Sequence, residues 1–95
     1  MLSYHQKRFL IVDDFSDFRS SVRSMLRELG VKDVDTADTG EQALKMCAQK
    51  SYDFILQDFH LGDGKKNGQQ VLEDLMVEKL ISHEAVFVMV TAETS

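Results

Sequence analysis

Three runs of mainly apolar residues in this chain are each followed by a side chain that carries an oxygen atom. The runs and the residues that follow them are 9–12 with Asp13 and Asp14, 54–57 with Asp58, and 86–90 with Thr91. Continuous apolar runs are typical of parallel strands that are buried on both faces. The carboxyl ends of parallel strands meet at one edge of a sheet, where open α/β folds bind their ligands. We therefore expect the four polar residues to converge on one site.

Segments with helical periodicity separate these runs. Ser16 can cap a first helix and Gly30 can end it, while Thr39 opens a second helix. A third helix follows the glycine-rich loop of residues 62–68. A weaker strand candidate, residues 34–37, lies between the first two helices and reads as an edge strand. Alternating strands and helices predict a parallel sheet with helices on both faces.

The bulk composition is that of one globular α/β domain. The chain has 95 residues, of which 43% are hydrophobic and 28% charged, and it contains no proline. A net charge of -5 argues against a nucleic-acid-binding surface, which needs clustered basic residues. No apolar stretch approaches the roughly 18 residues of a membrane span, and the amino terminus lacks a signal sequence. We therefore expect a cytoplasmic protein without direct membrane contact.

Apolar residues on the predicted helices are expected in the core. These include Phe18, Met25, Met46 and Met76, at positions that fit a helix face packed on the sheet. Cys47 is the single cysteine, so it cannot form an intrachain disulfide, and we expect it to be a small buried hydrophobic residue.

The expected cluster of Asp13, Asp14 and Asp58 indicates a cation site. Clustered carboxylates raise one another's pKa values unless a cation neutralises them. Hard oxygen ligands on separate strands suit an octahedral Mg²⁺ ion, which would also attract a phosphate. An aspartate in this position can act as a covalent nucleophile toward phosphorus, and the Thr91 hydroxyl could hold a phosphoryl oxygen.

These motifs resemble a known family. Residues 9–16, which read Phe-Leu-Ile-Val-Asp-Asp-Phe-Ser, Asp58 after an apolar strand, and residues 88–93 are similar to the receiver domain of bacterial response regulators, in particular the chemotaxis receiver. The resemblance implies a flavodoxin-like, doubly wound sheet whose first four strands lie in the order 2-1-3-4. It implies a two-component signalling module and not a conventional enzyme, although a receiver catalyses its own phosphorylation and dephosphorylation.

The resemblance also assigns roles to individual residues. It implies that Asp58 accepts a phosphoryl group from a sensor histidine kinase or a phosphotransfer protein. Asp13, Asp14, Asp58 and the backbone carbonyl of His60 would hold Mg²⁺ or Mn²⁺. Thr91 would then follow the phosphoryl group, with Ala92 leaving room for its movement, and a downstream output domain or protein would read the change.

Some features depart from the family pattern. Gly62 stands where the family usually has a proline, and the sequence contains no counterpart of the family's lysine at a fifth strand. On this basis we expect residues 1–95 to form a single incomplete receiver domain that lacks the fifth strand and the last two helices. An exposed edge on the fourth strand would then favour self-association.

Two other functions compete with the phosphoacceptor hypothesis. The absent lysine is compatible with a phosphorylation-independent protein-interaction module that retains the receiver fold. A small metal-dependent phosphatase would need a general acid near Asp58, for which His60 is a weak candidate.

Overall fold

The computed structural model describes residues 6–58, 67–80 and 84–90 of the chain. Strands and helices alternate along these residues, which confirms the predicted α/β organisation. Their bounds are β1 Arg8–Val12, α1 Ser16–Glu28, β2 Asp33–Ala37, α2 Gly40–Gln49, β3 Phe54–Asp58, α3 Gly68–Val77 and β4 Val86–Val90.

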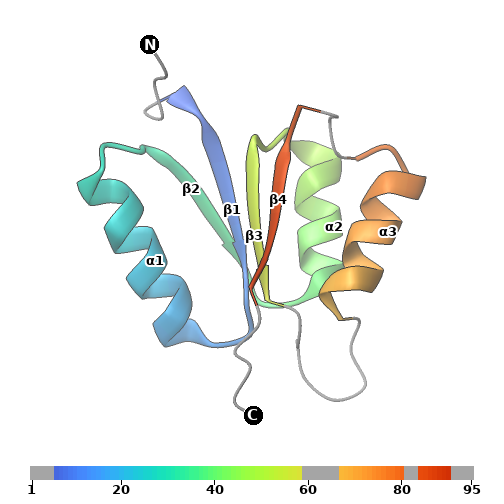
Figure 1. Ribbon diagram of the computed structural model, residues 1–95, viewed down its shortest axis with the longest axis horizontal. Coiled ribbons are helices and arrows are strands. Elements are labelled where there is room, and N and C mark those ends of the chain that lie inside the picture. The colour runs from blue at the N-terminus through green and yellow to red at the C-terminus, as the bar shows by residue number, and fades with distance from the viewer. Residues whose placement is uncertain (1–5, 59–66, 81–83, 91–95) are drawn as a thin grey trace.

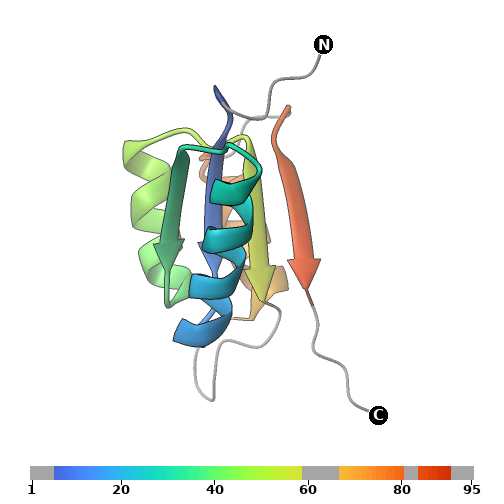
Figure 2. The same ribbon diagram turned by 90° about the vertical axis from the view of Figure 1, so that its left-hand side faces the viewer.

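The four strands are parallel and lie in the order β2-β1-β3-β4, as the family resemblance implies. Helix α1 covers one face of the sheet, and α2 and α3 cover the other, which gives three layers (Figure 1). Seen from the side of α1, β4 stands clear of that helix (Figure 2). Strands β1 and β3 are inner strands, whereas β2 lies at an edge of the described sheet, as expected.

Buried apolar side chains form one cluster on each face of the sheet. The cluster beneath α2 and α3 comprises Leu10, Val12, Ala37, Ala43, Cys47, Tyr52, Ile55, Val71 and Leu75. The cluster beneath α1 comprises Phe9, Ile11, Val31 and Val34. Successive residues of a strand point to opposite faces, so β1 supplies side chains to both clusters. This explains its unbroken apolar sequence, in which each fully buried aliphatic side chain stabilises the fold by about 1.5–3 kcal/mol.

The start of α1 differs from the prediction. Ser16 was expected to cap this helix, but Ser16 is its first helical residue, and the N-cap is Phe15, which makes no capping side-chain hydrogen bond. The cause is local, because the Phe15 amide already donates to Oδ1 of Asp13 at 2.8 Å. The turn after β1 is thus held by Asp13, the first residue after the strand, and a hydroxyl cap is not required there.

The end of α1 and the start of α2 agree with the sequence, whereas α3 begins at Gly68, the last residue of the predicted loop. The side chain of Thr39 accepts a hydrogen bond from the Gln42 amide and so caps α2. Gly30 has φ 93°, a left-handed conformation that glycine adopts at little cost, just after α1. The side chain of Asn67 caps α3 and forms a reciprocal capping box with Gln70.

The predicted core positions were only partly right. Cys47 is buried as predicted, and Met46 packs against the cluster beneath α2 and α3. Met25 and Met76 are 59% and 62% exposed, so their assignment to the core was wrong. In α1 the residues that meet the core are Val22 and Leu26, which leaves Met25 on the flank of the helix. Among the described helices, none has the length and apolarity needed to cross a membrane.

Candidate functional site

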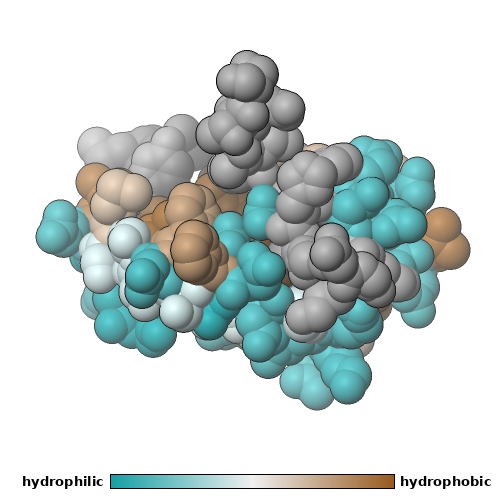
Figure 3. Space-filling model, turned by 90° about the horizontal axis from the view of Figure 1, so that it is seen from below, coloured by the Kyte–Doolittle hydropathy of each residue, from teal (hydrophilic) through white to brown (hydrophobic). Residues whose placement is uncertain are grey.

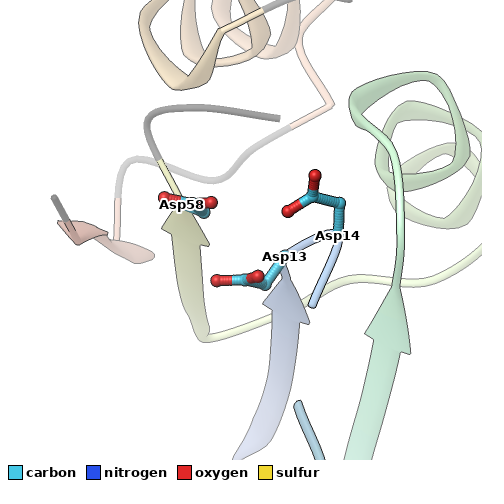
Figure 4. A group of neighbouring side chains, drawn as sticks. All are labelled: Asp13, Asp14 and Asp58. Carbon is cyan, nitrogen blue, oxygen red and sulfur yellow. The ribbon is translucent and has the colours of Figure 1, made fainter. Parts of the chain in front are cut away.

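Three aspartates meet at the carboxyl edge of the sheet, as the sequence predicts. Asp13 and Asp14 follow β1, and Asp58 is the last residue of β3. One carboxylate oxygen of each lies within 4.8 Å of the others. The carboxyl groups surround a common space above the ends of the two strands (Figure 4). Viewed onto this edge, a hydrophobic patch lies beside hydrophilic surface on the side of α1 (Figure 3).

The register of the two inner strands brings the acids together. Val12 of β1 pairs with Gln57 of β3, so the next residue of each strand, Asp13 and Asp58, projects from the same edge. The Asp13 amide also donates to the carbonyl of Ala37 in β2 at 3.1 Å. The backbone of Asp13 is therefore held by the sheet, and its Oδ1 atom is held by the Phe15 amide.

The three carboxylates differ in their surroundings. Asp13 is 7% exposed, whereas Asp58 is half-buried and Asp14 is exposed. Burial raises the pKa of Asp13, and the negative charges of Asp58 and Asp14 raise it further. The hydrogen bond from Phe15 and the charge of Arg19 oppose this effect, but the pKa of Asp13 remains above its ordinary value. The cluster is thus a place where positive charge is stabilised.

Arg19 belongs to the surroundings of this site, although the sequence did not reveal it. Its Nη1 atom donates to the main-chain carbonyl of Asp13 at 2.6 Å, from the second turn of α1. Its charge lowers the pKa of Asp13. The available signal was a basic residue six positions after the first aspartate, which helical geometry places back over the start of the helix.

Part of the predicted site lies outside the described residues. His60, whose carbonyl was predicted to bind the metal, and Thr91 and Ala92, the predicted switch residues, are in this part of the chain. Val90, which precedes Thr91 in the sequence, is the register partner of Asp58.

The donor set fits a small hard cation. Three carboxylates from two strands offer only oxygen ligands, and too few to enclose an ion, which suits Mg²⁺ because it retains several waters. The half-buried Asp58 is at the end of an inner strand, so its carboxylate can be approached from the edge of the sheet. Such an array can bind a cation and present a carboxylate to a phosphoryl group.

The fold and the acidic edge together are those of a receiver. A model of the response regulator receiver domain matches residues 9–95, so this chain belongs to that family. This confirms the resemblance seen in the sequence and places the chain among the receivers of two-component signalling.

The chain is similar to chemotaxis receivers over most of its length. It is 35% identical to the chemotaxis protein CheY-3 of Vibrio cholerae serotype O1 over 86 residues, which make up 90% of this chain and 64% of that protein. It is also 35% identical over 86 residues to the chemotaxis protein CheY of Pseudomonas aeruginosa, covering 90% of this chain and 67% of that protein. The chain therefore spans about two thirds of the length of these relatives.

Solved receiver structures share the fold. The response regulator TrrA of Thermotoga maritima, in complex with Mg²⁺ and BeF, superposes with a TM-score of 0.79 at 30% identity, covering 94% of this chain and 72% of TrrA. Vibrio cholerae CheY4 superposes with a TM-score of 0.80 at 26% identity, covering 94% of this chain and 71% of CheY4. The flavodoxin-like order of the four described strands is thus a shared feature.

Proposed function

We propose that this receiver accepts a phosphoryl group on Asp58 in a Mg²⁺-dependent reaction, with a phosphohistidine of a sensor kinase or phosphotransfer protein as the donor. The observation that carries the proposal is the approach of three carboxylates from two strands to within 4.8 Å. Burial is the main cause of the raised pKa of Asp13, and repulsion from Asp58 and Asp14 raises it further. A divalent cation removes this repulsion and at the same time attracts the phosphate.

Asp58 is the proposed nucleophile because of where it sits. It ends the inner strand β3, whereas Asp13 is buried and one of its oxygens accepts a hydrogen bond from Phe15. Asp14 is exposed and follows the strand. Asp13 and Asp14 are thus suited to hold the cation, and Asp58 is suited to share it and react. The carbonyl of His60 is proposed as a further ligand.

In the proposed reaction, a carboxylate oxygen of Asp58 attacks phosphorus and forms an O–P bond to give an acyl phosphate. The P–N bond of the phosphohistidine breaks, its electron pair returns to the imidazole, and the imidazole takes a proton from solvent. The cation supplies positive charge for the phosphoryl oxygens. Attack of water on the same phosphorus later releases phosphate and restores the carboxylate, so the receiver catalyses its own reset.

Thr91 and Ala92 are the proposed response elements. Val90 pairs with Asp58 across the β3–β4 ladder, and Thr91 follows Val90 in the sequence. A hydroxyl at the end of this neighbouring strand would be suited to bind a phosphoryl oxygen on Asp58. The change in its position would then alter the surface that a downstream output domain or protein reads.

A small acyl phosphate donor tests this proposal without a kinase. Incubation with Mg²⁺ should add the mass of one phosphoryl group, and chelation of the cation should prevent this. Asp58→Asn should abolish the addition, whereas Asp38→Asn, at an exposed position after β2, should leave it unchanged. Failure of the wild-type chain to gain mass, together with Mg²⁺-independent binding of its partner, would instead support the protein-interaction module.

A further inference from the structure

Gln57 is a buried polar residue in an otherwise apolar layer of the fold. Its exposed fraction is 0%, and Asp13 is the other buried polar or charged residue of the described chain. Alternation along β3 places its side chain on the same face as that of Ile55, which belongs to the cluster beneath α2 and α3. Its neighbours in register are Val12 and Met89. An apolar residue would therefore be expected at this position.

Among the described residues, the Gln57 amide makes one directed contact, which is to the main chain of the proposed nucleophile. Nε2 donates to the main-chain carbonyl of Asp58 at 3.2 Å. The buried Oε1 atom receives no hydrogen bond from any described residue. Exchange of the two amide atoms would set Oε1 against the carbonyl oxygen of Asp58, two acceptors face to face, so the Asp58 carbonyl determines the orientation of the amide.

This arrangement is unfavourable for the stability of the fold alone. A buried acceptor without a donor is destabilising, and replacement of a buried polar group by an apolar side chain of similar shape is often neutral or stabilising. The hydrogen bond that Gln57 makes is at the long end of the usual range, so it offsets only part of that penalty. Stability therefore does not account for a glutamine here, and its contact with Asp58 is the remaining feature.

Gln57 and the Asp58 carboxylate lie on opposite faces of β3, because successive residues alternate. The amide thus holds the Asp58 main chain from the side of α3, while the carboxylate is directed toward Asp13 and Asp14 (Figure 4). We propose that Gln57 is a positioning residue: its hydrogen bond to the Asp58 carbonyl fixes the orientation of the Asp58 carboxylate for cation binding. This inference rests on the proposed function.

Gln57→Met tests this role in the full 95-residue chain. Methionine has a similar length and volume but cannot donate a hydrogen bond. We expect Mg²⁺ affinity, measured by titration of the folded protein, to fall about tenfold, the lower end of the effects seen for groups that orient metal ligands. We also expect the midpoint of thermal unfolding without cation to stay the same or rise. Mg²⁺ affinity should therefore fall without a loss of stability.

The carbonyl ¹³C resonance of Asp58 supplies a readout that does not depend on the cation. Loss of the hydrogen bond should move this resonance upfield in Gln57→Met. Leu56→Met is the matched control, since it makes a similar apolar exchange at the adjacent residue on the other face of β3. This control should change neither the resonance nor the Mg²⁺ affinity. Gln57→Leu should repeat the effects of Gln57→Met. Agreement of the two variants would show that the effects come from loss of the hydrogen bond and not from the packing of methionine.

The results separate this inference from the proposed function. Unchanged Mg²⁺ affinity in Gln57→Met and Gln57→Leu, with wild-type binding abolished by Asp58→Asn, would overturn the role of Gln57 alone. A wild-type chain that binds no Mg²⁺ at the three aspartates would overturn both. Weakened Mg²⁺ binding with an unmoved Asp58 carbonyl resonance would also contradict the positioning role.

Discussion

The guanidinium of Arg19 donates from Nη1 to the main-chain carbonyl of Asp13 at 2.6 Å, which links the second turn of α1 to the end of β1. The contact places a positive charge next to three carboxylates, and this charge lowers the pKa of Asp13 against the stronger effect of burial. Arg19 therefore partly neutralises the cluster before any cation binds.

Replacement of Arg19 by methionine should raise the pKa of Asp13 further, because burial and the charges of Asp58 and Asp14 would then be less opposed. The measurement is a ¹³C titration of the Asp13 carboxyl group without divalent cations. Arg27→Met removes an equal charge from the exposed last turn of α1 and should leave this titration unchanged. Equal titration curves for Asp13 in wild type and Arg19→Met would contradict the electrostatic role.

Asp13→Asn should stabilise the cation-free protein. It removes one negative charge from the cluster and keeps an oxygen that can accept the hydrogen bond from the Phe15 amide. A gain of about 1 kcal/mol would raise the unfolding midpoint by roughly 4–8 °C in a domain of this size. Thermal unfolding followed by circular dichroism in the presence of a chelator checks this. Asp38→Asn, at an exposed position, is the control.

Mg²⁺ should stabilise the wild-type chain and have little effect on Asp13→Asn. Binding to the folded state alone adds about 2.7 kcal/mol when the free ion is at 100 times its dissociation constant. The order of stability should therefore reverse between chelator and saturating Mg²⁺. Equal stabilisation of both proteins by Mg²⁺ would place the ion elsewhere.

Tyr52→Phe should destabilise the fold at neutral pH by roughly 1–2 kcal/mol, in the range for a hydrogen bond to a charged group. The Tyr52 hydroxyl donates to Oδ2 of Asp35 at 2.6 Å, and Lys50 contacts the same oxygen at 3.0 Å. Burial alone would raise the pKa of Asp35, but the hydrogen bonds from Tyr52 and Lys50 lower it overall. These contacts of Lys50 and Tyr52 with Asp35 join β2 to the segment before β3.

The effect of Tyr52→Phe should depend on pH. A carboxylate whose folded pKa is depressed stabilises the protein above its unfolded pKa, and this contribution is lost as pH falls through the folded value. The difference in unfolding free energy between wild type and Tyr52→Phe should therefore shrink below about pH 4, the ordinary range of an aspartate. Urea unfolding across acidic pH measures this. If the difference in unfolding free energy stays constant down to the folded pKa of Asp35, the charge of the Asp35 carboxylate does not contribute to the effect of Tyr52→Phe.

Lys79→Gly should stabilise α3 by up to about 1 kcal/mol, because a lysine there adopts a left-handed conformation that glycine reaches without steric cost. Lys79 has φ 56°, and the next amide, of Leu80, bonds back to the carbonyl of Leu75 at 2.9 Å. Gly30 occupies the equivalent place after α1 with φ 93°. Urea unfolding of Lys79→Gly and of Lys45→Gly gives a direct comparison. The second variant lies within α2 and should lose about 1 kcal/mol instead.

The apolar runs were enough to predict β1, β3 and β4 and the acidic edge. Runs such as residues 9–12 are apolar at every position only when both faces of a strand are covered, and this places their carboxyl ends together. The approach of Asp13 to Asp58 followed from that geometry, and the structure confirms it. The strand order was taken from the family resemblance, since apolar periodicity does not determine which strands are neighbours.

The errors arose where tertiary contacts replaced a local preference. Ser16 was expected to be a cap, but the Asp13 side chain already binds the Phe15 amide, and the helix begins one residue earlier, at Ser16. Met25 fits the helical period, yet it lies on the flank of α1 and packs against no described residue of the core. Apolar spacing alone does not show which residues lie at the centre of the buried helix face. Arg19 and Gln57 donate hydrogen bonds to main-chain carbonyls, and a sequence does not show such contacts.

The position of β3 between β1 and β4 has a consequence for signalling. A strand with neighbours on both sides cannot shift without breaking ladder hydrogen bonds on each of them. Asp58 is thus mounted on one of the least movable parts of the sheet, and a group attached to it would act as a fixed point of negative charge. Other parts of the molecule would have to move toward it, so β3 would stay in place during the proposed switch.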